Sequence, residues 1–220
     1  MNRKSLITET CIAWAVVITA CHLAWRLQGV AWIAENTSLV SAVFLLYTPL
    51  VIYYRKKGKI AFLDASLSGF GKSVVIFLIF SAIIFPLAAV GNHFYQRIFF
   101  SFGYHPGLFP KPAKWALFQL LLVALPEEFF FRGYFLERMN EIFGKRWRLL
   151  GASVGGGLFV TSLVFALSHS LIHVQWWHIF IFFPALAFGW LKEKTGTITA
   201  PILFHTTANA FSYWVALHYF

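Results

Sequence analysis

Two adjacent acidic residues and one basic residue stand inside an apolar stretch of this sequence. Glu127 and Glu128 follow Pro126, and Arg132 comes four residues after Glu128. A charged side chain inside a membrane span is costly, so such residues are rare there and commonly mark a functional site. These residues are therefore the first candidates for chemistry.

Helical spacing gives the two acids different surroundings. Residues four apart share a helix face, so Glu128 and Arg132 can form an ion pair, which offsets much of the cost of keeping both charges there. Glu127 lies about 100° further round the helix, without a local partner. A poorly solvated carboxylate of this kind suits a general base. The alternative is that all three residues line a cytoplasmic helix end, which suits Arg132 but not two glutamates.

Two further segments carry polar residues that could complete a site. His169 comes four residues after Phe165, and Asn209 four residues after His205, so the members of each pair share a helix face. His205 and Asn209 form a ridge of hydrogen-bond donors suited to a developing oxyanion. Packing or interhelical hydrogen bonding explains each segment taken alone. Together with the glutamates, they favour one converging site built from three helices.

The elements that must position these residues are membrane helices. Of the 220 residues, 59% are hydrophobic and only 12% are charged, about half the charged share of a soluble domain. The net charge is +10, but the basic residues stand in short clusters between apolar stretches, which argues against a nucleic-acid partner. We expect a single integral membrane domain over residues 1–220.

Seven apolar stretches approach the length that a helix needs to cross a bilayer. They cover residues 11–33, 38–54, 73–92, 114–136, 152–172, 176–191 and 197–218. Residues 149–191 contain no Asp, Glu, Lys or Arg, which predicts two helices joined by a turn near His173 to Trp177. The basic clusters recur at alternate helix ends, so the positive-inside rule places the N-terminus in the cytoplasm. We expect an all-α, multi-pass transmembrane bundle of about seven spans.

The depth of the site depends on the helix that carries Glu127. If this helix ended near Gly133, Glu127 would lie near the cytoplasmic side and His169 near the other side, too far apart to share a water. A helix that continues toward Phe143 brings Glu127 to mid-membrane. The apolar residues after Gly133 favour this longer helix.

Three linked motifs match those of a known family. They are EExxxR at Glu127, Glu128 and Arg132, FxxxH at Phe165 and His169, and HxxxN at His205 and Asn209. Over roughly residues 110–215, which we take as the catalytic core, the chain resembles the CAAX-protease and bacteriocin-processing (CPBP, or Abi) family. This family includes the Rce1-type prenyl endopeptidases.

The resemblance implies an Rce1-like intramembrane glutamate protease whose helices enclose a polar cavity. By analogy, Glu127 and His169 activate a water, His205 and Asn209 form the oxyanion hole, and Glu128, Arg132 and Phe165 maintain the architecture of the site. The implied partner is a protein or peptide substrate in the lipid bilayer, cut near its C-terminus, and no cofactor is expected. We expect the protein in the bacterial inner (plasma) membrane.

Other mechanisms and functions compete with this interpretation. His169 and His173 are four apart, and with Glu127 and His205 they could form a zinc site, as in a metal-dependent membrane protease. A non-catalytic immunity or binding protein of the same fold is a second alternative. A small transporter that relays protons through Glu127 is a third. A protein without catalysis would be expected to lose part of the motifs, and none is lost.

Overall fold

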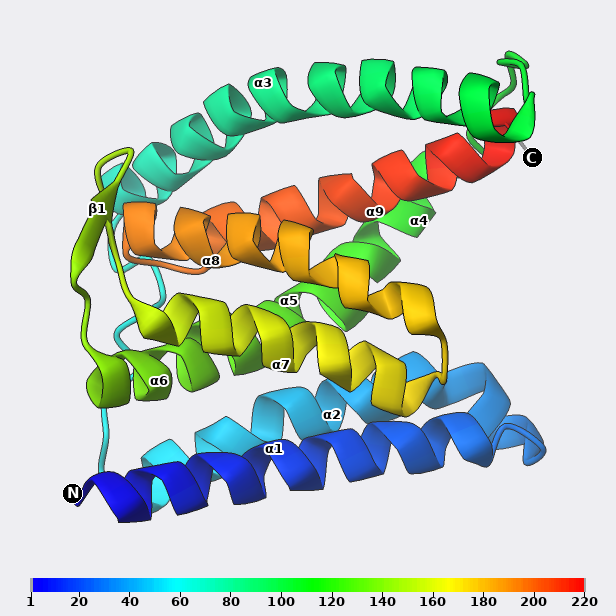
Figure 1. Ribbon diagram of the computed structural model, residues 1–220. Coiled ribbons are helices and arrows are strands. Elements are labelled where there is room, and N and C mark those ends of the chain that lie inside the picture. The colour runs from blue at the N-terminus through cyan, green and yellow to red at the C-terminus, as the bar shows by residue number, and fades with distance from the viewer. Residues whose placement is uncertain (1, 220) are drawn as a thin grey trace.

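The computed structural model describes residues 2–219, and its helices run along one long axis (Figure 1). The α-helices are α1 (Arg3–Arg26), α2 (Ala31–Arg55), α3 (Leu67–Phe100), α4 (Pro112–Phe118), α5 (Leu125–Glu128), α6 (Leu136–Phe143), α7 (Gly156–Ile172), α8 (Phe182–Thr195) and α9 (Thr199–Tyr219). Two π-helical segments, η1 (Gln119–Ala124) and η2 (Phe129–Phe135), and one 3-10 helix, η3 (Trp176–Ile181), accompany them. The strands are β1 (Trp147–Leu149) and β2 (Ala152–Val154).

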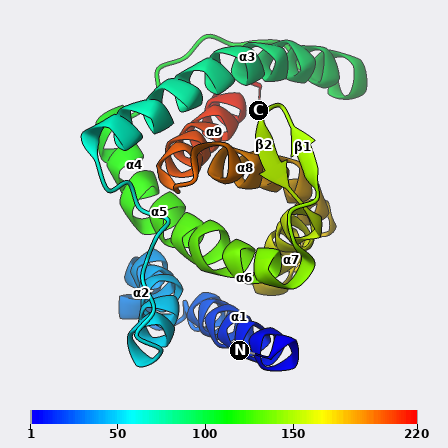
Figure 2. The ribbon, with the colours of Figure 1, turned by 90° about the vertical axis from the view of Figure 1, so that its left-hand side faces the viewer.

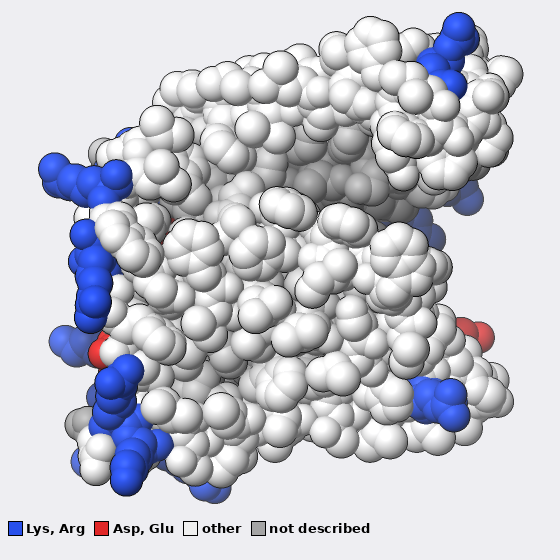
Figure 3. Space-filling view, viewed as in Figure 1, with Lys and Arg blue, Asp and Glu red and all other residues white. Residues whose placement is uncertain are grey.

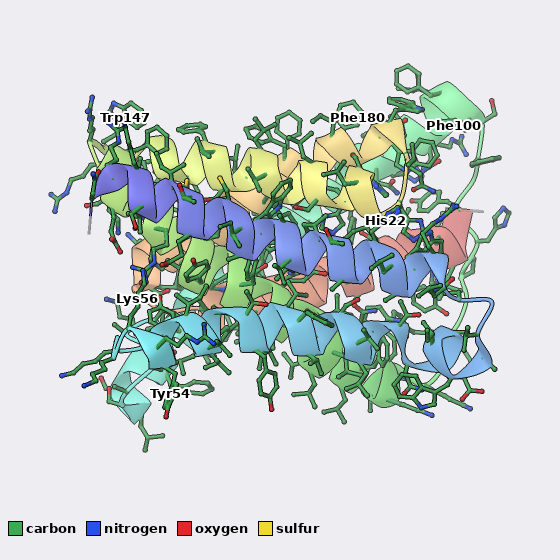
Figure 4. All side chains as sticks on the ribbon, turned by 90° about the horizontal axis from the view of Figure 1, so that it is seen from below. His22, Tyr54, Lys56, Phe100, Trp147 and Phe180 are labelled. Carbon is green, nitrogen blue, oxygen red and sulfur yellow. The ribbon has the colours of Figure 1, made fainter. Side chains whose placement is uncertain are left out.

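The helices are stacked in layers. In Figure 2, α1 and α2 lie as a pair beneath the other helices, and α3 lies on the opposite side of the molecule. The remaining helices lie between, with α7 packed against α6 and α8, and α9 against α8 and α3. Seen from below, α1 and α2 cross the face together, with Lys56 and Trp147 near one end and Phe100 and Phe180 near the other (Figure 4).

One unbroken helix, which we call the long helix, runs from Pro112 to Phe143 through α4, η1, α5, η2 and α6. This confirms the continuing helix that the sequence favours and places Glu127 near its midpoint. Pro126 lies inside it and cannot donate the backbone hydrogen bond of a regular helix, and a π-helical segment lies on each side of the proline. Such π segments are frequent at functional sites.

The mainly helical fold agrees with the all-α expectation, and a small β-hairpin accompanies the helices. Strands β1 and β2 pair antiparallel. Leu150 and Gly151 between them both have positive φ, which two-residue hairpin turns of this kind require. The apolar stretch expected at 152–172 therefore starts as a strand, and its helix begins only at Gly156. Apolar composition alone did not distinguish the strand from the helix.

The ends of several helices also differ from the apolar stretches. The first stretch was expected to reach residue 33, but α1 ends at Arg26 and α2 begins at Ala31. At its other end α1 starts early, because the side chain of Asn2 caps it by accepting a hydrogen bond from the Lys4 amide. The turn predicted near His173 is confirmed, since α7 ends at Ile172 and η3 follows.

Three helices, α1, α2 and α3, are long and apolar enough to cross a membrane, and α7 is apolar but shorter. This supports an integral membrane protein. The total of about seven spans stays a prediction.

Basic side chains gather at the end of the molecule where α1 begins, which we call the basic end (Figure 3). Ion pairs tie the elements together there. Glu9 of α1 pairs with Lys56 and Arg138, and Glu193 of α8 pairs with Lys145 and Lys192. The clustering agrees with the basic residues lying at alternate helix ends, and the N-terminus-in orientation stays a prediction.

Glycine allows the close approach of α7 to α6. A Cβ atom on Gly157 would lie 2.6 Å from Oδ1 and 2.9 Å from the backbone nitrogen of Asn140. Because backbone atoms cannot move aside independently, Gly157→Ala should lower the free energy of unfolding by about 1–3 kcal/mol. Thermal unfolding in detergent measures this.

The matched control is Gly91→Ala in α3, where a Cβ atom would meet nothing within 4 Å. We expect no loss of stability there, since alanine is the better helix former. Equal unfolding temperatures for the two variants would contradict the close-packing account.

Candidate active site

A fully buried ion pair lies at the centre of the protein. Nη1 of Arg132 donates to Oε1 of Glu128 at 3.0 Å, and Nη2 donates to the carbonyl oxygen of Ala185 at 3.2 Å. Both charged side chains are 0% exposed. The guanidinium lies over the rings of Phe165 and Phe188, 4.2 and 5.0 Å from their centroids. The structure thus contains the ion pair that the helical spacing predicts.

His205 extends this ion pair to α9. Its Nδ1 lies 2.8 Å from Oε1 of Glu128, and its ring stacks on Phe188 with 4.6 Å between centroids. An ionised carboxylate only accepts hydrogen bonds, so Nδ1 carries the proton. Nε2, the other ring nitrogen, lies 3.9 Å from Oε2 of Glu127.

His169 reaches Glu127 from α7. Its Nδ1 lies 2.9 Å from the carbonyl oxygen of Phe165, one helical turn earlier. A carbonyl also only accepts, so Nδ1 is the donor and Nε2 of the neutral ring carries a lone pair. This Nε2 lies 4.0 Å from Oε2 of Glu127. The FxxxH spacing therefore fixes the tautomer of the histidine.

Glu127 differs from Glu128 in its surroundings. Its Oε2 is buried, faces both imidazoles and, within residues 2–219, has no hydrogen-bond partner. The Glu127 side chain is 19% exposed, whereas that of Glu128 is 0% exposed. The distances from Oε2 to the two Nε2 atoms are too long for direct hydrogen bonds. A water with legs of about 2.8 Å, meeting at roughly 90°, would bridge Glu127 and His169.

A cavity of about 510 Å³ borders Glu127 and His169. Phe131 and Ser168 line it beside them, and α1 and α2 provide the facing wall. Neither His205 nor Asn209 is among its lining residues.

Asn209 is held apart from the glutamates. Its Nδ2 donates to Oε1 of Gln119 at 2.9 Å. The structure therefore gathers five of the other six motif residues around Glu127 and places the sixth, Asn209, one turn beyond His205 with a partner of its own. Gln119 was not among the residues predicted from the sequence, although a polar amide eight residues before Glu127 in an apolar stretch was the available signal.

Two other neighbours of the site were also missed. Trp14 donates from Nε1 to Oγ of Ser168 at 2.9 Å, which ties α1 to α7 beside His169. Phe188 supplies the ring on which His205 stacks. Neither has a motif-like spacing, because each acts from an element distant in the sequence.

The residues of the zinc alternative do not form a metal-binding group in the described part of the chain. No group of three or more His, Cys, Asp or Glu residues there is arranged to hold a metal ion. His173, one of the four residues of that alternative, packs against Trp25 with 3.4 Å between ring centroids.

Comparison with protein families identifies the C-terminal half of the chain. Residues 109–211 match a family model described as Type II CAAX prenyl endopeptidase Rce1-like. The matched region starts just before α4 and ends within α9, so it contains all three motifs. No curated protein and no solved structure matches the chain.

Removing one member of the buried ion pair should be costly. Arg132→Met leaves the Glu128 charge without its main partner, so the free energy of unfolding should fall by about 3–5 kcal/mol. The double variant Glu128→Gln, Arg132→Met should lose less than the sum of the two single losses, because it leaves no unpaired charge. Thermal unfolding of the four proteins in detergent measures this coupling, and strictly additive losses would contradict the pairing role.

Proposed function

We propose, from the match of residues 109–211 to the Rce1-like family model, that the chain is an intramembrane endopeptidase of the glutamate type. The family is one of proteases, so the general reaction is hydrolysis of a peptide bond. One observation carries the mechanism. Oε2 of Glu127 has no hydrogen-bond partner and lies 4.0 Å from Nε2 of His169 and 3.9 Å from Nε2 of His205.

In the proposed mechanism, Glu127 and His169 hold the attacking water. The water donates one hydrogen bond to Oε2 of Glu127 and the other to Nε2 of His169, which leaves an oxygen lone pair directed away from both. The hydrogen bond from Nδ1 of His169 to the Phe165 carbonyl keeps Nε2 available as the acceptor. Fixing a water between two acceptors orients its lone pair before the substrate arrives.

The chemical steps follow general acid–base catalysis. As the water oxygen bonds to the scissile carbonyl carbon, one of its protons passes to Glu127. When the bond between carbon and nitrogen breaks, the proton held by Glu127 passes to the leaving nitrogen. The products are a free carboxyl end and a free amino end, and Glu127 is again ionised.

His205 is placed to stabilise the oxyanion, but only in one protonation state. Its Nδ1 proton already binds Glu128, so a donor at Nε2 requires the doubly protonated imidazolium. This cation then lies between the carboxylates of Glu127 and Glu128. In this proposal Asn209 supplies a second donor and must exchange its bond to Gln119 for one to the oxyanion.

Glu128 and Arg132 act as positioning residues. Glu128 accepts from both Arg132 and His205, so one carboxylate connects the long helix to α9. Arg132 also binds the Ala185 carbonyl of α8. Together they set the distance between Glu127 and His205 without contacting the substrate.

We propose a peptide bond near the C-terminus of a membrane-anchored protein or peptide as the substrate. The cavity beside Glu127 is the proposed site for its chain, filled with water when no substrate is bound. We further propose one membrane domain with residues 110–215 as its catalytic core, in a bacterial plasma membrane with the N-terminus in the cytoplasm. No cofactor takes part in the proposed reaction.

Glu127→Gln should lower processing by roughly 10²-fold or more, because an amide cannot take the proton of the water. The protein should stay folded, since Oε2 of Glu127 has no hydrogen-bond partner within residues 2–219. Membrane proteomes of cells with the wild type and with the variant, compared for proteins whose C-terminal mass changes, measure the effect. The control is Glu141→Gln on the same long helix, where half of the glutamate side chain is exposed. Full processing by Glu127→Gln would end the glutamate-base proposal.

Chelators test the remaining zinc mechanism. We expect purified protein to keep its activity in the presence of a strong zinc chelator, since the proposed reaction uses only side chains and water. Loss of activity with chelator, restored by added zinc, would replace Glu127 as the activating group by a metal ion.

A further inference from the structure

Half of the wall of the candidate active-site cavity comes from outside the family-matched region. Helix α1 contributes Ile18, Cys21, Trp25 and the following Gln28, and helix α2 contributes a face from Ala34 to Leu45. The matched region starts only at residue 109. The features that distinguish this protein's substrate can therefore lie on α1 and α2.

The wall that α2 presents to this cavity is polar. Ser38 and Ser41 line it about one turn apart, with Thr37 and Glu35 nearer the start of the helix. Elsewhere on the α1–α2 pair, a second cavity is lined almost entirely by apolar residues such as Leu23, Trp32 and Phe44. Lipid suits the second lining, whereas a lining with hydroxyl groups suits a peptide, whose backbone carries hydrogen-bond donors and acceptors.

The mouth of the cavity lies at the end opposite the basic end. Its outer residues are Gln28 and Glu35, beside the turn between α1 and α2, and His173 and His178, at the turn between α7 and η3. The basic end lies at the start of α1 (Figure 3), and the end of α2 and the start of α7 lie at the same end of the molecule (Figure 1). Under the positive-inside rule, the mouth therefore faces away from the cytoplasm.

Glu35 gives this mouth a negative charge. Of the other seven acidic residues, Glu127 and Glu128 lie in the site, Asp64 lies in the loop between α2 and α3, and four form ion pairs with Lys or Arg, namely Glu9, Glu137, Glu141 and Glu193. Glu35 is exposed and forms no ion pair within residues 2–219. On the facing wall, desolvation and then the neighbouring imidazoles lower the pKa of His173, so it is neutral at pH 7. Among the residues that line the cavity, the charged ones are Glu127 in the site and Glu35 at the mouth, whereas Arg26, in the last turn of α1, is not part of the lining.

We propose that the substrate peptide enters this cavity from the extracytoplasmic end and that Glu35 selects a cationic residue, Lys or Arg, on the part of the peptide that lies in the mouth. This inference rests on the proposed function for the nature of the occupant. The direction of entry and the preference for a cation are properties of the cavity and can be measured without turnover.

The experiment uses two thiol reagents of opposite charge, the cationic MTSET and the anionic MTSES, neither of which crosses membranes. The native thiols are first removed as Cys11→Ser and Cys21→Ala. Ser38→Cys then reports on the mouth, with Thr37→Cys as a second reporter if the first does not fold. Leu108→Cys and Leu67→Cys are matched controls, because these leucines are 93% and 90% exposed. Leu108 lies in the loop between α3 and α4, at the mouth end, and Leu67 is the first residue of α3, at the basic end (Figure 1).

In intact spheroplasts, Ser38→Cys and Leu108→Cys should react, and Leu67→Cys should react only after permeabilisation. At Ser38→Cys, the rate with MTSET relative to MTSES should exceed the ratio at Leu108→Cys by roughly tenfold, as a local negative potential requires. Glu35→Gln should abolish this excess, and Glu35→Asp should keep it.

Reaction of Ser38→Cys only after permeabilisation would overturn entry from the extracytoplasmic end. An unchanged ratio in Glu35→Gln would overturn the selection of a cation. Labelling in a Glu127→Gln background separates this inference from the proposed function. If the labelling rates of Ser38→Cys are the same in this background as with Glu127 present, they support the cavity inference whether or not the protein processes a substrate. A loss of processing in Glu127→Gln concerns only the proposed catalytic mechanism.

Discussion

The buried ion pair between Glu128 and Arg132 is the interaction on which the site depends. A single carboxylate oxygen of Glu128 accepts from the long helix through Arg132 and from α9 through His205. Arg132 continues to the backbone of α8 at Ala185. Because each partner would leave an uncompensated charge if it moved, three helices are fixed relative to one another. The distance between Glu127 and the imidazole of His205 follows from this arrangement.

The long helix gives the two adjacent glutamates of the motif different surroundings. Glu127 and Glu128 are adjacent, yet one carboxylate is fully bonded into the protein while the other keeps an unpartnered oxygen toward the cavity. Pro126 precedes them, with π-helical segments on both sides. Phe62, from the loop between α2 and α3, packs its ring against Gly133, where a Cβ atom would lie 2.5 Å away. Local backbone geometry and packing thus both support the separation of roles.

The two N-terminal helices, α1 and α2, form part of the wall of the cavity beside Glu127. Glu9 binds them to the basic end through Lys56 and Arg138, and Trp14 binds α1 to Ser168 beside His169. With these two attachments, the polar face of α2 lies across the cavity from Glu127. The family-matched region is in this way combined with a cavity wall from the helices that precede it.

The sequence by itself determined the membrane class, the positions of the motifs and the pairing of Glu128 with Arg132, because apolar length and helical periodicity are local properties. It also favoured the long helix through Glu127. It did not predict the hairpin after Phe143, where backbone turn geometry outweighed apolar composition, or the partner of Asn209. Only the tertiary structure decided which atoms face Glu127 and which helices line its cavity, since those contacts join residues far apart in the chain.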